Sequence, residues 1–189
     1  SASICKTDLT SELVGEFPEL QGLMGGYFSA YQGFDKDISL SLTEQYLPVG
    51  LNSKVPKKPF SIALSITDKI DTIVGFFGIN EKPTSSKDPL ALRRTALGVI
   101  RTIVENKKNL KLNDLLNYSS SLYEDQGFNL SNKNLQKELN DFLKDRFKYY
   151  LKEKQIRYDI IDAITSSFSL NKLSSSYQKA QSLNKIINS

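Results

Sequence analysis

The side chains that could take part in ligand chemistry in this chain are mainly cationic, and they gather in two stretches. The first is a basic loop and the start of the helix after it, with Lys82, Lys87, Arg93, Arg94 and Arg101. The second is a long amphipathic segment, with Lys137, Lys144 and Lys148. Lysine and arginine neutralise phosphates and release counterions, which is the chemistry of nucleic-acid binding. We therefore predict that these eight residues bind RNA.

Two other interpretations of these cations stay open. Arg94 and Arg101 are seven residues apart and could instead pair with carboxylates of neighbouring helices or of a partner subunit. The lysines of the second stretch could simply form a solvated helix face. The charge distribution bears on this choice, because residues 131–189 hold 11 Lys and Arg against 6 Asp and Glu, while residues 1–130 hold 14 against 15. Such an asymmetry is typical of a side that faces a polyanion.

Several kinds of catalysis are excluded by the residue types that are missing. The chain has no histidine, which removes Ser-His-Asp and Cys-His catalysis and His-ligated zinc. Its single cysteine, Cys5, allows no intrachain disulfide and no cysteine-based metal cluster. Asp68 and Asp71 alone would hold a divalent ion weakly, and the alternative is an ion-pair cluster that includes Lys69. We predict no catalytic residue and no metal ligand.

The composition is that of an ordinary globular protein. Hydrophobic residues make up 39% and charged residues 24% of the chain, which carries a net charge of +4. No apolar run approaches the length needed to cross a membrane, so we expect no membrane partner. One cysteine in 189 residues suits a reducing compartment, and the predicted location is cytoplasmic.

Apolar residues recur at helical spacing through nearly the whole chain, and this pattern predicts an all-α fold. The predicted helices cover residues 7–17, 20–31, 35–47, 60–77, 88–107, 111–123, 131–154, 158–165 and 177–187. The residues expected to begin helices are Asp35, Asp88 and Ser131 as caps, with Pro89 at a first helical position. Gly78 and Gly127 are expected to end helices. The segments 48–59 and 165–176 are predicted loops.

Three features of this pattern concern packing and domains. The helix over 60–77 is predicted to lie in the centre of the fold, because it is strongly apolar in register. The helix over 20–31 carries an apolar stripe, and Gly22, Gly25 and Gly26 in the same segment favour close approach of another backbone. Charge and motif density change near 127–131, so we predict a compact domain over 1–128 and a smaller helical segment over 129–189.

Five runs of residues, at 5–9, 19–25, 44–48, 68–79 and 82–101, resemble motifs of one family, the β subunit of the heterotetrameric bacterial glycyl-tRNA synthetase. Residues 82–101 read K-P-x-x-x-K-D-P-x-A-L-R-R-x-A-L-G-V-x-R, and residues 68–79 read D-K-x-D-T-x-x-G-x-F-G-I. Shorter runs are C-K-T-D-L at 5–9, E-L-Q-G-x-M-G at 19–25 and E-x-Y-x-P at 44–48. The resemblance covers residues 5–105 with good specificity and thins beyond residue 110. It implies that the chain is a piece of a longer subunit.

The resemblance also implies a fold and a role. Residues 1–128 would form an N-terminally truncated, degenerate HD-like helical domain, and residues 129–189 would lead towards an anticodon-binding-type module. The chain would contribute tRNA binding and subunit assembly to the aminoacylation of tRNA-Gly, with no catalytic centre of its own. Its expected partners are tRNA-Gly and the α subunit, with no DNA, and ATP and Mg²⁺ are expected in that α subunit.

Two alternatives to this role remain. The chain could be a structural module that only docks the α subunit. Less favoured is a metal-dependent phosphohydrolase of the HD type, against which the absence of histidine argues.

Overall fold

The computed structural model describes residues 2–84 and 86–188, and these residues form helices, turns and loops without a strand. The predicted all-α fold is thereby confirmed. Contacts divide the chain into two compact units, Ser1–Asp68 and Lys69–Ser189, which are described separately. This division differs from the predicted boundary at 128/129, which stays a prediction. No described helix is both long and apolar enough to pass through a membrane.

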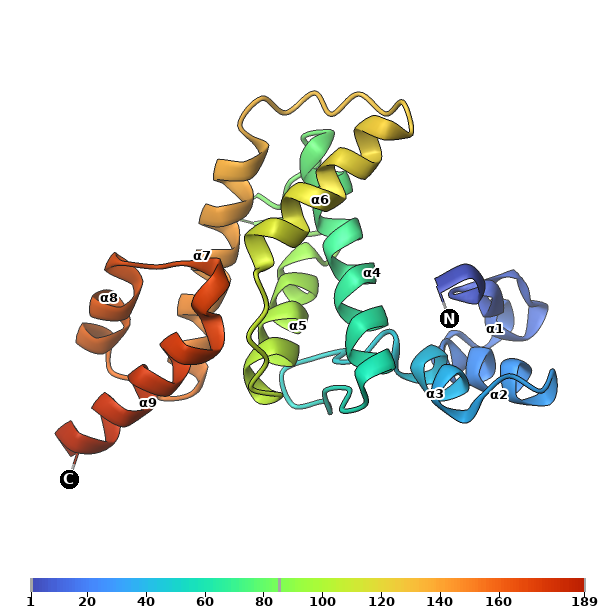
Figure 1. The fold of residues 1–189 in the computed structure, drawn as a ribbon, viewed down its shortest axis with the longest axis horizontal. Helices are drawn as coiled ribbons and strands as arrows, with labels where there is room; N and C mark the ends of the chain where they lie inside the picture. Colours follow the sequence, from blue (N-terminus) through green and yellow to red (C-terminus); the bar gives the residue numbers. More distant parts are fainter. Residues whose placement is uncertain (1, 85, 189) are drawn as a thin grey trace. The chain divides into compact units, whose positions relative to one another are not determined.

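The N-terminal unit is built from short helices (Figure 1). Its elements are η1 (Ala2–Ile4), η2 (Thr7–Thr10), α1 (Glu12–Glu16), η3 (Pro18–Leu20), α2 (Leu23–Tyr31), α3 (Lys36–Glu44) and the first part of α4 (Pro59–Gly78). The helix predicted over 7–17 is split at Ser11, which is extended and accepts a hydrogen bond from Val14 N (3.3 Å). The expected cap Asp35 accepts from Asp37 N (2.7 Å) and starts α3.

Helices α2 and α3 pack closely because α2 presents glycines to α3, as the sequence predicted. A Cβ at Gly26 would lie 1.9 Å from Thr43 Oγ1 and 3.0 Å from the carbonyl oxygen of Ser39. Gly22 has φ +80°, and its N–H donates to Oδ2 of the fully buried Asp8 (2.6 Å). The glycines therefore pack within this unit.

The apolar stripe predicted on the second helix is largely exposed. Tyr27 and Tyr31 are 62% and 94% exposed, and Leu23 and Phe28 are also exposed. The physical reason is that the glycine side of α2, with its small residues, occupies the contact with α3. These four apolar residues are called the α2 apolar face below.

Helix α4 agrees with its prediction over nearly its whole length. Its apolar positions are buried, namely Ile62, Ile66, Ile70, Ile73, Val74 and Phe77. The helix ends differently, because the residue with left-handed backbone is Asn80 (φ 64°) rather than Gly78. Gly78 is needed for close packing, since a Cβ there would lie 2.5 Å from Leu130 Cδ2.

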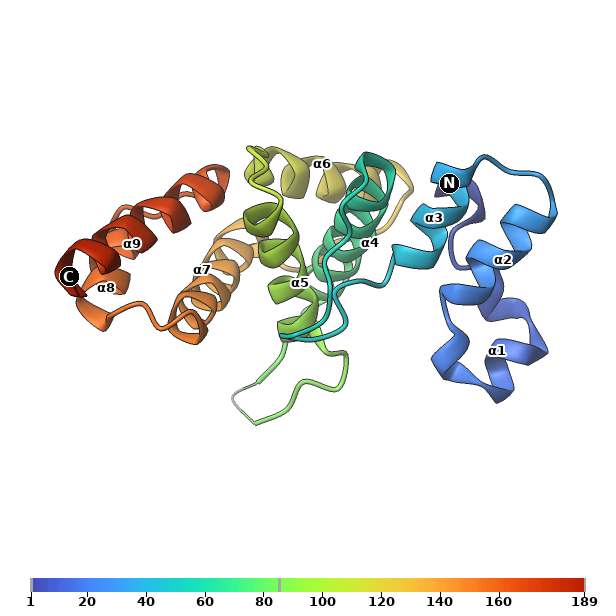
Figure 2. The same cartoon turned by 90° about the horizontal axis from the view of Figure 1, so that it is seen from below.

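The C-terminal unit contains the end of α4 and the helices that follow it in the chain (Figure 2). They are α5 (Leu92–Glu105), α6 (Leu112–Asp125), α7 (Leu135–Glu153), α8 (Tyr158–Ser166), η4 (Leu170–Lys172) and α9 (Leu173–Asn188). Helix α5 packs against α7 and α9, and α8 packs against both α7 and α9. Gly127 (φ +83°) follows α6, as predicted.

Helix α5 begins later than its motif predicts. Asp88 caps it as expected, since its Oδ1 accepts from Leu92 N (2.8 Å) and its Oδ2 from Arg93 N (3.0 Å). However, Ala91 has a left-handed backbone (φ 54°), so the helix begins at Leu92. Pro89 consequently lies in the turn before the helix and not at its first position.

The starts of α7 and α9 also differ from prediction. Ser131 does not cap α7, because Asn132 Oδ1 accepts from Asn134 N (2.9 Å) and the helix begins at Leu135. The predicted loop 165–176 contains η4 and the first turn of α9. The reason is that Leu170 and Leu173 are buried, and their burial orders the serine-rich segment.

Candidate nucleic-acid interface

The two ends of the basic loop 82–87 differ in how their lysines are held. Lys82 Nζ lies 2.7 Å from Glu138 Oε2 on α7, and Asn132 Nδ2 donates to the same oxygen (2.6 Å). The hydrogen bond from Lys82 is the main cause that holds the pKa of the Glu138 carboxyl below its ordinary value. Lys82 thus ties the loop to α7, whereas Lys87 is exposed.

The three arginines of α5 also have different surroundings. Arg93 is half-buried, and its guanidinium donates to the carbonyl oxygen of Thr84. Arg101 is 5% exposed, and its Nε lies 2.8 Å from Glu105 Oε1. Arg94 is exposed and has no ion pair within the described residues. For Arg101 this geometry favours the alternative of carboxylate pairing over phosphate binding.

The five cations of the first stretch therefore do not form one cluster of free charges. Lys87 and Arg94 are the two whose charged groups face solvent. The other three hold the loop and α5 in place. Most cations of this stretch thus hold the loop and α5 in position, and two of the five are exposed to a ligand.

Helix α7 separates an apolar side from a cationic side. Its buried residues include Leu139, Leu143 and Phe147. Lys137 is exposed and Lys144 and Lys148 are partly exposed, and none of the three has an ion pair in the part of the chain that the structure describes. Their spacing of seven and four residues places them on one side of the helix. We call Lys137, Lys144 and Lys148 the α7 lysine face.

Other exposed groups of α7 modify this face. Asp141 and Asp145 are exposed and reduce its net charge. Arg146 lies over the ring of Tyr149, 5.6 Å from the centroid, and Tyr149 is partly exposed. An aromatic ring beside cations is a surface on which an unpaired base can stack. Helical spacing places Tyr149 about a third of a turn around α7 from the α7 lysine face, so this ring lies beside that face and not on it.

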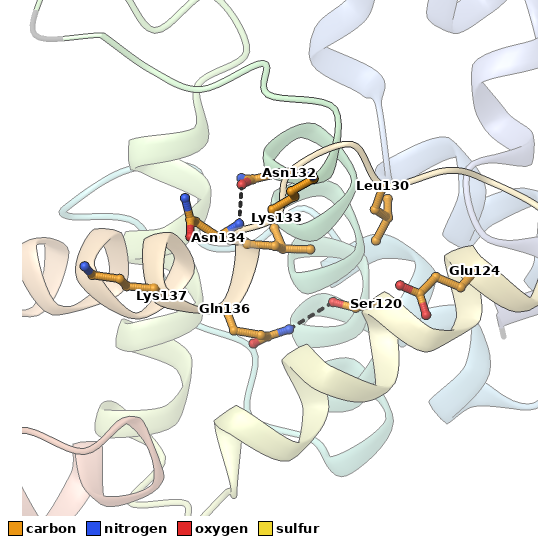
Figure 3. A pocket seen from close by; sticks show the side chains of 9 residues that line it. Ser120, Glu124, Leu130, Asn132, Lys133, Asn134, Gln136 and Lys137 are labelled. Carbon is orange, nitrogen blue, oxygen red and sulfur yellow. Dashed lines mark hydrogen bonds between the residues drawn. The ribbon is translucent and has the colours of Figure 1, made fainter.

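A pocket of about 300 Å³ lies where α6 meets the start of α7 (Figure 3). Gln136 Nε2 donates to Ser120 Oγ (3.1 Å) and joins the two helices across it. Lys133, Lys137 and Glu124 also line it. Figure 3 shows Lys137 extending away from the bonded Gln136 and Ser120. This side chain is thus directed outwards, as a phosphate contact requires.

The aspartates considered for a metal have protein partners. Lys6 Nζ lies 2.5 Å from Asp68 Oδ1, so Asp68 forms an ion pair, with a lysine other than the Lys69 named in the sequence analysis. The phenol of Tyr123 on α6 donates to the carbonyl oxygen of Asp71 (3.2 Å). Burial, with the nearby Asp71 carboxylate, raises the pKa of Tyr123 to about 12. Within residues 2–84 and 86–188, no group of three His, Cys, Asp or Glu side chains is placed to hold a metal ion.

A second basic site was missed by the sequence analysis. A groove of about 600 Å³ is lined by four lysines, namely Lys107, Lys111, Lys172 and Lys179. They come from two segments about 60 residues apart in the chain, so no local pattern joins them. Lys172 ends η4 and Lys179 lies on α9, within the segment that the sequence analysis predicted to be a loop over 165–176 and a helix from 177.

Comparison with known proteins relates the chain to a single family. The family model described as "Glycyl-tRNA synthetase beta subunit" matches residues 1–166. The "Glycine--tRNA ligase beta subunit" of Rickettsia canadensis (strain McKiel) is 47% identical over 160 residues, which cover 85% of this chain and 23% of that protein. The protein of the same name from Rhodospirillum centenum is 43% identical over 164 residues, which cover 87% of this chain and 22% of that protein. The protein of the same name from Rickettsia peacockii (strain Rustic) is 42% identical over 181 residues, which cover 92% of this chain and 26% of that protein. The chain thus spans about a quarter of the length of these relatives.

Proposed function

Because this chain belongs to the glycyl-tRNA synthetase beta-subunit family, we propose that it takes part in the aminoacylation of tRNA-Gly as a piece of glycine–tRNA ligase. The family is the one that its motifs predicted. The proposed contribution is tRNA binding and subunit assembly, in the cytoplasm. The proposal assigns ATP and Mg²⁺ to the α subunit and no catalytic centre to this chain, which contains no histidine.

The observation that carries the tRNA-binding role is the α7 lysine face. Of its three lysines, Lys137 is exposed and Lys144 and Lys148 are partly exposed, and the buried residues of α7 hold the helix that carries them in one orientation. Exposed Lys87 and Arg94 are additional contacts in this proposal. Contacts of this kind neutralise backbone phosphates and give affinity without sequence information.

The test of this role is fluorescence anisotropy of labelled tRNA-Gly with the 189-residue chain, beside a non-cognate tRNA. Phosphate contacts predict binding that weakens steeply as salt rises from about 50 to about 200 mM. Equal affinity for both tRNAs would assign recognition of tRNA-Gly to other parts of the enzyme. Absence of binding to either tRNA at 50 mM salt would contradict the role and leave docking as the function.

The assembly role is supported by a different observation, the α2 apolar face. Two tyrosines, a leucine and a phenylalanine are exposed on one side of α2, while its glycine side is occupied by α3. Exposed aromatic residues grouped on one helix face are typical of protein interaction sites. We assign this face to the α subunit.

A further inference from the structure

The lysine-lined groove in the C-terminal unit has a composition that points to an anionic ligand. It lies between the turn joining α5 to α6 and the region where η4 leads into α9. Besides its four lysines, its lining is polar and uncharged, formed by Asn109, Asn171, Ser174, Ser175 and Gln178. No aspartate or glutamate lines it.

The four lysines are exposed, and none has an ion pair among the residues that the structure describes. Ammonium groups gathered around one groove repel one another and raise the local positive potential. A bound anion relieves this repulsion. The groove therefore has the positive potential that attracts an anionic ligand.

The walls of the groove are held in place by buried neighbours. Leu112 at the start of α6 is buried, and so are Leu170 and Leu173 on the other wall. Asn171 Oδ1 accepts a hydrogen bond from Asn113 N (2.9 Å) and joins the two walls. The lysine stems thus begin from a fixed backbone, which reduces the entropy lost when a ligand binds.

Helix polarity adds to the positive potential. Helices α6 and α9 both begin beside the groove, with Lys111 just before α6 and Ser174 and Ser175 in the first turn of α9. The first turn of α9 contains no acidic residue, and that of α6 contains Asp114, which does not line the groove. The positive end of each helix dipole favours a phosphate there.

We propose that this groove binds the phosphodiester backbone of RNA. About 600 Å³ is room for more than one phosphate, and the amide and hydroxyl side chains suit ribose 2′-hydroxyl groups. The lining cations are all lysines, which bind phosphate as point charges without a fixed geometry. The identity of the RNA as tRNA rests on the proposed function. The groove is a second contact, made by different lysines from those of the α7 lysine face.

The test compares two double variants of the 189-residue chain in the anisotropy titration with tRNA-Gly. One is Lys111→Gln with Lys172→Gln, and the control is Lys36→Gln with Lys54→Gln, which removes the same charge from exposed sites elsewhere. Circular dichroism establishes that both variants are folded. We expect the groove variant to bind tRNA roughly tenfold more weakly than the wild type. The salt slope, which is the slope of log affinity against log salt concentration, should fall in magnitude by about 1.5, because each lost phosphate contact contributes about 0.7 to 0.9 to it. We expect the control variant to bind like the wild type.

The outcomes separate this inference from the proposed function. Wild-type binding with equal affinities for the groove and control variants would overturn the groove alone and leave the α7 lysine face. Absence of wild-type binding would overturn both. Poly-glutamate that binds the wild type more tightly than the groove variant, while both bind tRNA equally, would overturn the RNA assignment in favour of an acidic polypeptide.

Discussion

The seven-residue spacing of Arg94 and Arg101 places them on the same side of α5, but Arg94 is exposed and Arg101 is buried. Both arginines lie in the motif at 82–101, seven residues apart. Arg94 faces solvent, whereas Arg101 is buried beside Glu105. Residue type and spacing could not distinguish them, because the burial of Arg101 depends on α7 and α9 packing against α5. At this scale the sequence predicted the Asp88 cap correctly, since a cap is a local interaction.

These two arginines give a paired prediction. Arg101→Gln leaves Glu105 without its partner in a largely buried site, and we expect it to reduce the free energy of unfolding by about 2 kcal/mol. Arg94→Gln should change the free energy of unfolding by less than about 0.5 kcal/mol and weaken tRNA binding. Urea unfolding and tRNA anisotropy measure the two effects. A stable Arg101→Gln variant with weakened tRNA binding would assign Arg101 to phosphate after all.

Gly26 is predicted to be intolerant of even a methyl group. Gly26→Ala places a Cβ against Thr43 and the carbonyl oxygen of Ser39, so α2 and α3 must separate or Thr43 must change rotamer. We expect a loss of about 1 to 3 kcal/mol in the free energy of unfolding. The matched control is Gly15→Ala in α1, where nothing lies within 4 Å of the new Cβ. Equal melting temperatures for the two variants would contradict the close packing.

Tyr123 makes a pH-dependent prediction. Its pKa is raised in the folded chain, so the folded state holds the phenolic proton more tightly than the unfolded state. The stabilisation is therefore fully present below the ordinary tyrosine pKa of 10.0 and is lost as pH rises from there towards about 12. Wild type should be more stable than Tyr123→Phe at pH about 9, and the difference should shrink by pH about 11. A difference that stays constant in urea unfolding would show that Tyr123 titrates alike in both states.

At the scale of elements, prediction worked where a helix has one unambiguous apolar side. Helices α4 and α8 lie almost where their patterns placed them, and the core positions of α4 are buried. Helix α2 has two sides that could pack, a glycine side and an aromatic side, and its sequence pattern left open which neighbour each of them contacts. Close backbone contact through glycine needs a partner helix of matching shape, which a single-segment pattern does not reveal.

The α2 apolar face carries the prediction for assembly. Tyr27→Ser with Tyr31→Ser should leave the fold intact, because both side chains are largely exposed. It should weaken binding to the α subunit at least about tenfold, since interface tyrosines contribute about 1 kcal/mol or more each. Calorimetric titration of the chain with the α subunit measures this. Tyr118→Ser is the control, with a similar exposure of 63% on α6. Unchanged affinity in the double variant would remove the α2 apolar face from the interface.

For the whole molecule, charge and contacts divide the chain differently. The excess of positive charge lies in residues 131–189, whereas the boundary between the two compact units, after Asp68, falls within the sequence of α4. The family and the all-α fold could be predicted because they depend on many residues at once. The lysine groove could not, since its two walls become neighbours only when η4 packs beside α6.

The central claim is that the α7 lysine face binds tRNA phosphates, and the most direct measurement of it is the salt dependence of tRNA-Gly affinity in a triple variant. The triple variant combines Lys137→Gln, Lys144→Gln and Lys148→Gln. We expect it to bind tRNA-Gly more weakly than the wild type, with a salt slope smaller in magnitude by about two to three. The control removes three exposed lysines of the N-terminal unit, Lys36, Lys54 and Lys57. A triple variant that binds like this control, with an unchanged slope, would contradict the account.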